Sequence, residues 1–305
     1  MITITQVSYI LALWEYKNFQ KAADSCFITQ PTLSMQLKKA EESLGSPLFD
    51  RSSSPLSLTD FGKAIFPELR QIQDSMLHLE IKIKQLEGNL KEEVRIGIIP
   101  TIAIYLVPEF YSTWRKKLEN ISIEIVELKS EELLLQLAER KIDFGIMAGP
   151  LQQDKLNQQI LFNESIDVFT NEVDPPSISR NALSELHPWL LTKGNCLRTQ
   201  MVNFCNINEV DKDEWNYTGG NLDLLVKMVL QEGGYTLIPE YYSLPKELDT
   251  YRKSLEEAKP YRQIIGVFNR NSIKMKSIQQ IIQHIQSSKG KDFEQGAFRD
   301  LLPWR

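Results

Sequence analysis

Two short amphipathic patterns lie back to back near the start of the chain, between residues 19 and 45. Thr29 is a good helix N-cap, and Pro31 suits the first turn of the second helix, where its missing N–H costs little. Gly45 is the kind of residue that ends a helix. Two short helices joined by a tight turn predict a helix-turn-helix, whose second helix would lie in the DNA major groove. The expected buried positions are Ala22, Ala23 and Phe27 in the first helix, and Leu33, Leu37, Ala40 and Leu44 in the second.

The outer face of the second helix is polar. Its amide, hydroxyl and ammonium groups are typical partners for base edges and phosphates, and the helix N-terminus offers free N–H groups to a phosphate. A small helical bundle with a polar surface would show the same periodicity, so the pattern alone leaves both interpretations open. The candidate DNA-contacting residues of this helix are Gln30, Pro31, Thr32, Ser34, Gln36 and Lys38.

A narrow apolar seam follows, along a helix that Thr59 would cap and that runs to about residue 87. Its apolar positions are spaced by 4, 3, 4, 3, 4 and 3 residues, the a/d pattern of a coiled coil. Pro67 would kink the helix near its start. The alternative is a single helix packed on its own domain. Such a helix usually has a broader apolar face, so the seam favours dimerisation. The seam residues are Ile65, Leu69, Ile72, Met76, Leu79, Ile83 and Leu86.

From Val94 onward, short apolar strands alternate with helices, which predicts a mainly parallel sheet with covering helices. The fold class is therefore α/β with an all-α N-terminal part. The expected strands are 94–100, 122–128, 143–149, 166–170, 189–192, 235–239 and 263–270. The expected helices are 108–118, 130–140 with Ser130 as the cap, 221–231, and a last one around 278–285.

Composition sets outer bounds on this picture. A chain of 305 residues is long enough for two or three compact units. No apolar run approaches a membrane span and the first twenty residues lack a signal-peptide pattern, so we expect a cytoplasmic protein that does not contact membranes. Residues 1–60 carry five basic and six acidic side chains. The DNA-binding hypothesis therefore rests on the motif and not on a general positive charge.

The three cysteines are Cys26, Cys196 and Cys205. Cys26 lies in the apolar pattern of the first motif helix and is expected to be a small buried hydrophobic residue. The other two are nine positions apart, too sparse for a four-ligand zinc site, and no other metal site or cofactor is indicated. Structural disulfides are rare in the cytosol. The chemistry of the residues alone leaves a redox pair or two unrelated thiols.

The N-terminal segment resembles the winged helix-turn-helix of the LysR-type transcriptional regulators. Two departures are Asn18, where a small residue is usual, and Ala40, where leucine is usual. The resemblance places a wing at residues 51–58, with Arg51 near the DNA backbone. The matching residues are Phe19, Ala22, Ala23, Gln30, Pro31, Thr32, Leu33, Ser34, Leu37, Glu41, Leu44, Gly45, Leu48, Phe49, Arg51, Leu58, Thr59 and Gly62.

The same resemblance implies the organisation of the whole chain. Double-stranded operator DNA and a second copy of the chain are the implied partners, with dimers pairing into a homotetramer. The effector domain would have two lobes, built like a periplasmic binding protein. The implied boundaries are 1–58 for the DNA-binding domain, 59–89 for the dimerisation helix and hinge, 90–305 for the effector domain, about 90–163 and 268–305 for lobe I, and about 164–267 for lobe II.

The stretch G-N-C-L-R-T-Q, with its second cysteine nine positions after the first, resembles the peroxide-sensing branch of the LysR family. The segment around Thr101 agrees with that branch too. The resemblance implies that hydrogen peroxide oxidises Cys196 and that Cys205 resolves the product to a disulfide. Ser130 stands where threonine is usual, Asn195 where histidine is usual, and Arg270 is next to the position of the usual basic residue. The implied peroxide-site residues are Cys196, Cys205, Thr101, Ser130, Asn195 and Arg270.

Two other functions are alternatives to a peroxide-sensing regulator. A LysR-type regulator could bind a small organic ligand between its lobes, with the cysteines incidental. A thiol peroxidase would need neither a DNA-binding head nor a dimer seam, so the sequence favours a regulator that is not an enzyme.

Overall fold

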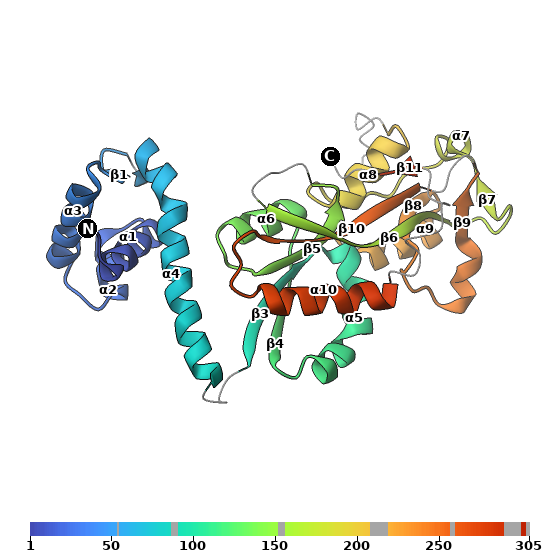
Figure 1. The fold of residues 1–305 in the computed structure, drawn as a ribbon. Coiled ribbons are helices and arrows are strands. Elements are labelled where there is room, and N and C mark those ends of the chain that lie inside the picture. The colour runs from blue at the N-terminus through green and yellow to red at the C-terminus, as the bar shows by residue number, and fades with distance from the viewer. Residues whose placement is uncertain are drawn as a thin grey trace. The chain divides into compact units, whose positions relative to one another are not determined.

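The computed structural model describes residues 1–53, 55–86, 91–151, 156–207, 219–256, 260–289 and 300–302. The chain forms two compact units, Met1–Leu90 and Lys91–Arg305. Each is described by itself (Figure 1).

The N-terminal unit is a helical domain with a two-stranded wing. Asn18 accepts a hydrogen bond from the Lys21 N–H and so caps α2, which accounts for the polar residue at this position. Thr29 caps α3, and Gly45 ends it with φ +80°, a left-handed conformation that glycine adopts easily. Apolar side chains of α1 to α4 and the wing share one core. The elements are α1 (Ile4–Tyr16), α2 (Phe19–Ser25), α3 (Gln30–Leu44), β1 (Phe49–Asp50), β2 (Ser57–Leu58) and α4 (Asp60–Leu86).

Two residues expected in this core lie outside it. Helix α2 ends at Ser25, so Cys26 is its C-cap and is only half-buried. Phe27 follows with φ +56° and is 96% exposed. The prediction of buried side chains at both positions was wrong, because the tight turn between the helices begins one residue too early for the helical spacing to continue.

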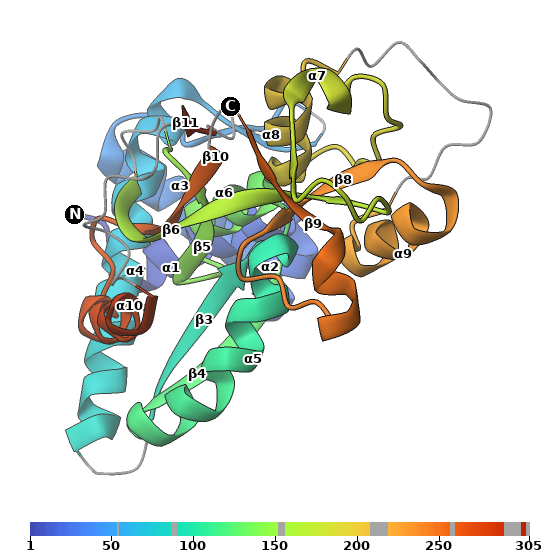
Figure 2. The ribbon, with the colours of Figure 1, turned by 90° about the vertical axis from the view of Figure 1, so that its right-hand side faces the viewer.

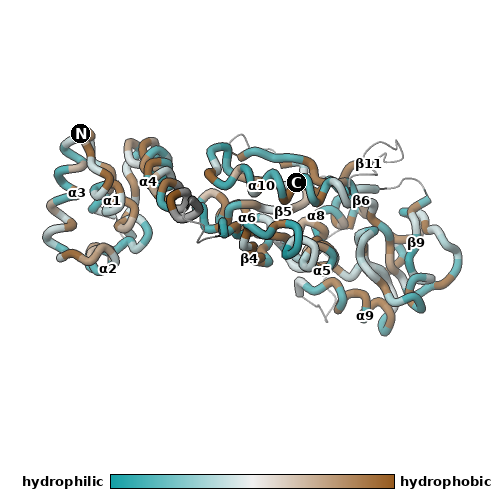
Figure 3. Tube along the Cα trace, turned by 60° about the horizontal axis from the view of Figure 1, so that its bottom comes forward, coloured by the Kyte–Doolittle hydropathy of each residue, from teal (hydrophilic) through white to brown (hydrophobic). Residues whose placement is uncertain are grey.

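Helix α4 runs unbroken through Pro67 for 27 residues. The apolar positions along it are visible in Figure 3. Its start packs on its own domain: Leu69 is buried in the N-terminal core and Ile65 packs against that core. Farther along, Ile72, Leu79 and Ile83 are 40%, 53% and 48% exposed. Met76 is half-buried, and the side chain of Leu86 lies outside the described residues. The seam available for pairing is therefore the later part of the helix.

The C-terminal unit contains a sheet with strand order β4-β3-β5-β10-β6-β9-β7, with β11 on β10 and β8 on β6. Antiparallel pairs join β10 to β5 and β6, so the sheet is mixed and not mainly parallel as predicted. The elements are β3 (Glu92–Ile98), α5 (Pro100–Lys117), β4 (Ile121–Glu127), α6 (Ser130–Ala138), β5 (Phe144–Gly149), β6 (Leu156–Thr170), β7 (Ser177–Ile178), α7 (Arg180–Leu183), α8 (Cys196–Phe204), α9 (Leu222–Glu232), β8 (Tyr235–Pro239), η1 (Lys246–Tyr251), β9 (Arg252–Leu255), β10 (Pro260–Asn269), α10 (Met275–Lys289) and β11 (Asp300–Leu301).

This unit has two hydrophobic cores, which define lobe I and lobe II. The long strand β6 passes from one to the other, since Phe162 belongs to the first core and Ile166 to the second (Figure 2). The return crossing lies between Leu255 of the second core and Ile264 of the first. The sequence interpretation placed it near 267–269, which is wrong because β10 pairs with β5 from residue 263 on and so already belongs to lobe I.

Two further elements differ from the predictions. Helix α5 begins at Pro100 and not at Pro108, which lies inside the helix. Residues 189–192 form no strand, although the preceding Pro188 makes an isolated β-bridge with Tyr235 and the Trp189 N–H donates to the Tyr235 carbonyl oxygen over 2.8 Å. Within the described ranges, no helix has the length and apolar character of a membrane span.

Candidate functional site

A buried ion pair lies where β6 and β10 are paired, next to the crossing between the lobes. Glu164 and Arg262 are cross-strand partners, and both side chains are fully buried. The Arg262 Nε donates to Glu164 Oε1 over 2.6 Å. Its other two nitrogens donate to Thr101, Nη1 to Oγ1 over 3.1 Å and Nη2 to the carbonyl oxygen over 3.2 Å. The guanidinium therefore joins the two crossing strands to the start of α5.

Burial dominates the electrostatics of this cluster. Burial raises the pKa of Glu164, although the adjacent guanidinium opposes that shift. Burial also works against the charge of Arg262, but the Glu164 carboxylate overcomes it and raises the pKa of the arginine. Burial and the same carboxylate hold the pKa of the Tyr105 phenol well above its usual range. Since arginine does not lose its proton in proteins, Arg262 is a permanent positive charge inside the unit.

Cys196 is the first residue of α8, and its side chain is buried. It belongs to the core of lobe I, whereas Leu197 and Met201 on the same helix belong to lobe II. It also lies close enough to Arg262 for the charges of the two side chains to interact.

Ser130 and Asn195 lie at the starts of α6 and α8, and the residues before them, Lys129 and Gly194, lie close together. Ser130 is the first residue of α6 and not its cap, and its buried hydroxyl has no hydrogen-bond partner within the described part of the chain. Asn195 is the N-cap residue of α8 and is buried. Its amide donates to the carbonyl and hydroxyl oxygens of Thr192 over 3.0 and 2.9 Å. Asn195 therefore shapes the loop before α8.

Arg270, which the sequence analysis assigned to the peroxide site, lies elsewhere. Arg270 is exposed in the turn after β10. Eight residues of extended strand separate it from Arg262, about 26 Å. The structure therefore does not bring Arg270 to the buried cluster, whose arginine is Arg262. The signal that the sequence offered was an arginine within a strand, immediately before Q-I-I-G-V-F. Arg198 donates from Nη1 to the Leu191 carbonyl oxygen over 2.7 Å.

Cys205 is the C-cap residue of α8 and is half-buried against the core of lobe II. Burial raises the pKa of its thiol, and the nearby Tyr235 hydroxyl and Arg180 guanidinium oppose that shift. The two cysteines are free and nine positions apart along the helix, so their Cα atoms are about 13 Å apart. A disulfide requires about 4.4 to 6.8 Å between Cα atoms. The helix must therefore unwind before the two sulfur atoms can bond.

In the N-terminal unit, α3 presents most of the predicted DNA-contacting residues at its surface. Gln30, Pro31 and Lys38 are exposed, and Ser34 is half-buried. The Thr32 hydroxyl lies 2.8 Å from that of Thr29.

One residue of the predicted DNA-contacting set faces inward. The amide oxygen of Gln36 accepts a hydrogen bond from Gln6 on α1 over 3.2 Å. Gln36 therefore helps to hold α3 on α1.

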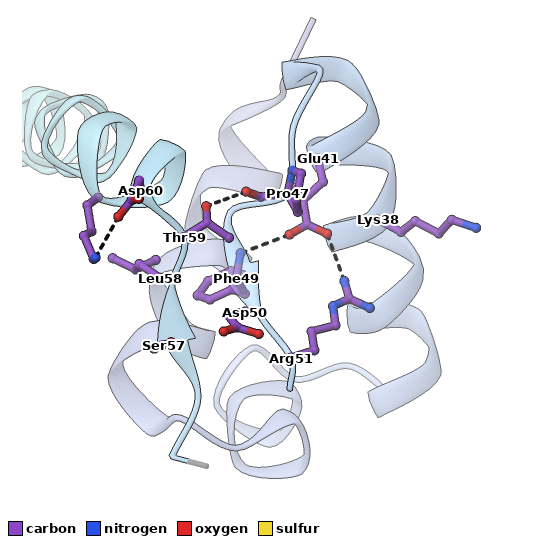
Figure 4. Close-up of a pocket in the computed structure, with 11 residues that line it drawn as sticks. Lys38, Glu41, Pro47, Phe49, Asp50, Arg51, Ser57, Leu58, Thr59 and Asp60 are labelled. Atoms are coloured by element: carbon purple, nitrogen blue, oxygen red, sulfur yellow. Dashed lines mark hydrogen bonds and ion pairs between the residues drawn. The ribbon is translucent and has the colours of Figure 1, made fainter. Parts of the chain in front are cut away.

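Glu41 joins the wing to α3. Its Oε1 accepts hydrogen bonds from the backbone N–H groups of Leu48 and Phe49 over 2.8 and 3.3 Å. Its Oε2 accepts one from Arg51 over 2.9 Å. A groove lies beside this contact, between α3, the wing and the start of α4 (Figure 4). Its basic lining residues are Lys38, Arg51 and Lys63.

Comparison with known proteins gives two family matches. The helix-turn-helix model of bacterial regulatory proteins of the lysR family matches residues 4–63, and the LysR substrate binding domain matches residues 87–289. The hydrogen peroxide-inducible genes activator of Pectobacterium carotovorum subsp. carotovorum is 30% identical over 250 residues, which are 81% of this chain and 82% of that protein.

Solved structures agree with the fold. A full-length OxyR variant from Pseudomonas aeruginosa has a TM-score of 0.69 at 23% identity, covering 94% of this chain and 95% of that one. An OxyR mutant from Corynebacterium glutamicum with hydrogen peroxide bound has a TM-score of 0.57 at 25% identity, covering 94% and 92% of the two chains. With a helix-turn-helix head and a two-lobed unit that each match a family model, this chain belongs to the LysR family of bacterial regulatory proteins.

Proposed function

We propose that this chain is a DNA-binding transcriptional regulator that senses hydrogen peroxide through Cys196 and Cys205. The observation that supports the proposal most is the place of Cys196, a buried thiol at a helix N-terminus beside the Arg262–Thr101 contact. Relatives named as hydrogen peroxide-inducible activators point to the same chemistry.

The chemistry proceeds in two displacements. The Cys196 thiolate attacks one oxygen of hydrogen peroxide, so an S–O bond forms, the O–O bond breaks and the second oxygen leaves as water after taking up a proton. The Cys205 thiolate then attacks the sulfenic sulfur, so the S–S bond forms and the S–O bond breaks with release of a second water. The two thiols lose two electrons in all, and one peroxide accepts them. Thr101 and Ser130 offer hydroxyl groups for holding the peroxide.

The protein turns this bond into a change of shape because α8 separates the two thiols. Unwinding α8 withdraws its apolar residues Leu197, Met201 and Phe204 from the core of lobe II. Burying three such side chains is worth several kcal/mol, on the order of 2 each, so the disulfide shifts the packing of the whole lobe. We propose that this repacking alters how the two DNA-binding heads of a dimer are spaced.

Operator DNA and a second copy of the chain complete the proposed mechanism. Helix α3 enters the major groove with Gln30, Thr32 and Ser34, and Lys38 and Arg51 contact phosphates. The exposed seam of α4 pairs two chains, and dimers pair into tetramers. The protein works in the cytoplasm, where reducing thiols return the disulfide to its resting state. It is a sensor and has no catalytic turnover of its own.

A small-ligand regulator is the second candidate. The buried Ser130 Oγ has no hydrogen-bond partner within the described residues. Buried polar groups normally have partners, so this hydroxyl also suits a small polar molecule. In that case the cysteines are incidental.

Thiol counting after brief exposure to stoichiometric peroxide separates the two candidates. The sensor loses two thiols per chain, Cys196 and Cys205, and keeps Cys26. A chain that keeps all three thiols, or loses them only at large excess of peroxide, is not a peroxide sensor.

A further inference from the structure

The C-terminal strand is joined to the helix that carries the two cysteines. Gln200, the middle residue of α8, donates from Nε2 to the carbonyl oxygen of Leu302 over 2.8 Å. Both residues are buried, at 1% and 6% exposure. The amide oxygen of Gln200 has no hydrogen-bond partner in the described ranges. The hydrogen bond to Leu302 is therefore the one that this buried side-chain amide makes there.

Within the described residues, the strand is also held by β10 and by the core of lobe II. Strand β11 is two residues long and pairs with β10 through Pro260–Asp300 and Tyr261–Leu301. The Leu302 N–H donates to the Tyr261 carbonyl oxygen over 2.8 Å. The Leu302 side chain packs in the core of lobe II, the same core that receives the apolar face of α8. The hydrogen bond from Gln200 therefore helps to hold this short strand against the rest of lobe II.

Unwinding α8 breaks the Gln200–Leu302 hydrogen bond. Gln200 lies halfway between the two cysteines, so it cannot keep its position while their Cα atoms close from about 13 Å to disulfide distance. The buried Leu302 carbonyl would then lose its donor, and an unsatisfied buried acceptor is costly. Exposure to water satisfies that oxygen only if the strand leaves β10.

We propose that Gln200 couples the C-terminal strand to the redox state of the protein. Formation of the Cys196–Cys205 disulfide breaks the Gln200–Leu302 hydrogen bond and releases β11 from β10. The intact hydrogen bond in turn slows disulfide formation, because it must break first. The inference rests on the proposed function and adds a second output to it, a strand β11 that becomes accessible on oxidation.

Hydrogen exchange of the Leu302 amide in the full chain tests the coupling. We expect exchange to speed up at least tenfold when the wild-type disulfide forms. Cys205→Ser treated with peroxide keeps slow exchange, because its sulfenic acid leaves α8 wound. Gln200→Met in the reduced state already exchanges faster, by about two- to tenfold, the factor expected for one hydrogen bond of ordinary net strength. Its disulfide forms faster by a similar factor.

Gln286→Met is the matched control, since Gln286 Nε2 also donates to a backbone carbonyl oxygen, that of Ile160, over 2.7 Å, but from α10. It should change neither rate. If mass spectrometry shows the disulfide while the Leu302 amide stays protected, the coupling is refuted and the sensor proposal stands. If no disulfide forms in the wild type, the sensor proposal itself fails, and the coupling fails with it.

Discussion

Cys196 and Cys205 occupy the two ends of one helix and face two different hydrophobic cores. Cys196 opens α8 in the core of lobe I, and Cys205 caps the helix against the core of lobe II. Helix α8 therefore keeps the two thiols apart, and it must unwind before they can form a disulfide.

The two cysteines should differ in their response to substitution. Cys196→Ser should abolish the fast reaction with peroxide, because the thiol near Arg262 is gone. Cys205→Ser should leave that reaction but stop at the sulfenic acid or beyond, seen as added oxygen by mass spectrometry. Cys26→Ser is the control and should behave as the wild type. A wild-type chain in which Cys205 reacts first would contradict these roles.

The resolving step should accelerate with pH. Burial raises the pKa of the Cys205 thiol, so only a small thiolate fraction exists at neutral pH and that fraction grows as pH increases. The rate of disulfide formation should therefore rise from about pH 7 to 9 without a plateau.

Tyr235→Phe removes the hydroxyl that partly opposes this shift, so the profile should move to higher pH. Tyr242→Phe, whose hydroxyl donates instead to Asp223, is the control. Identical pH profiles for Tyr235→Phe and the wild type would show that Tyr235 does not act on the resolving thiol.

Breaking the buried ion pair should destabilise the effector unit strongly. Arg262→Met leaves the Glu164 carboxylate buried without its charged partner, which typically costs about 3–5 kcal/mol. Chemical denaturation measures the change. Lys141→Met removes a pair with Glu139 in which the lysine is 61% exposed, and should cost less than about 1 kcal/mol. Similar losses for the two variants would mean that Glu164 gains solvent or another partner.

The exposed part of α4 should hold the dimer. Leu79→Glu places a charge in the seam and should raise the dimer dissociation constant, as measured by sedimentation of the full chain. Leu77 is a suitable control, because it is exposed to nearly the same degree, 50% against 53%, but lies off the seam. If Leu77→Glu weakens the dimer as much as Leu79→Glu, the heptad register is wrong.

Thr32→Glu should abolish operator binding without unfolding the domain, because it brings a negative charge to the phosphates at the start of α3. Ser122→Glu adds the same charge to β4 in the other unit and should leave binding intact. A gel-shift titration at a stated salt concentration measures the difference. Unchanged affinity for Thr32→Glu would remove α3 from the interface.

Local patterns predicted the helix-turn-helix and its caps at Thr29 and Gly45, because these depend on neighbouring residues. Arg262 was missed because its role depends on Glu164, 98 positions earlier, and on Thr101, 161 positions earlier. The Gln200–Leu302 contact, 102 positions apart, was missed for the same reason. Such pairings follow from strand order, which the spacing of apolar residues does not specify.

The Glu41 carboxylate has a consequence for how any signal reaches DNA. Because one side chain grips the backbone at Leu48 and Phe49 and also the Arg51 guanidinium, the wing cannot swing independently of α3. Each DNA-binding domain therefore acts as a rigid unit. Regulation has to change the distance and angle between the two domains of a dimer. Oxidation would then change which spacing between operator half-sites the dimer binds.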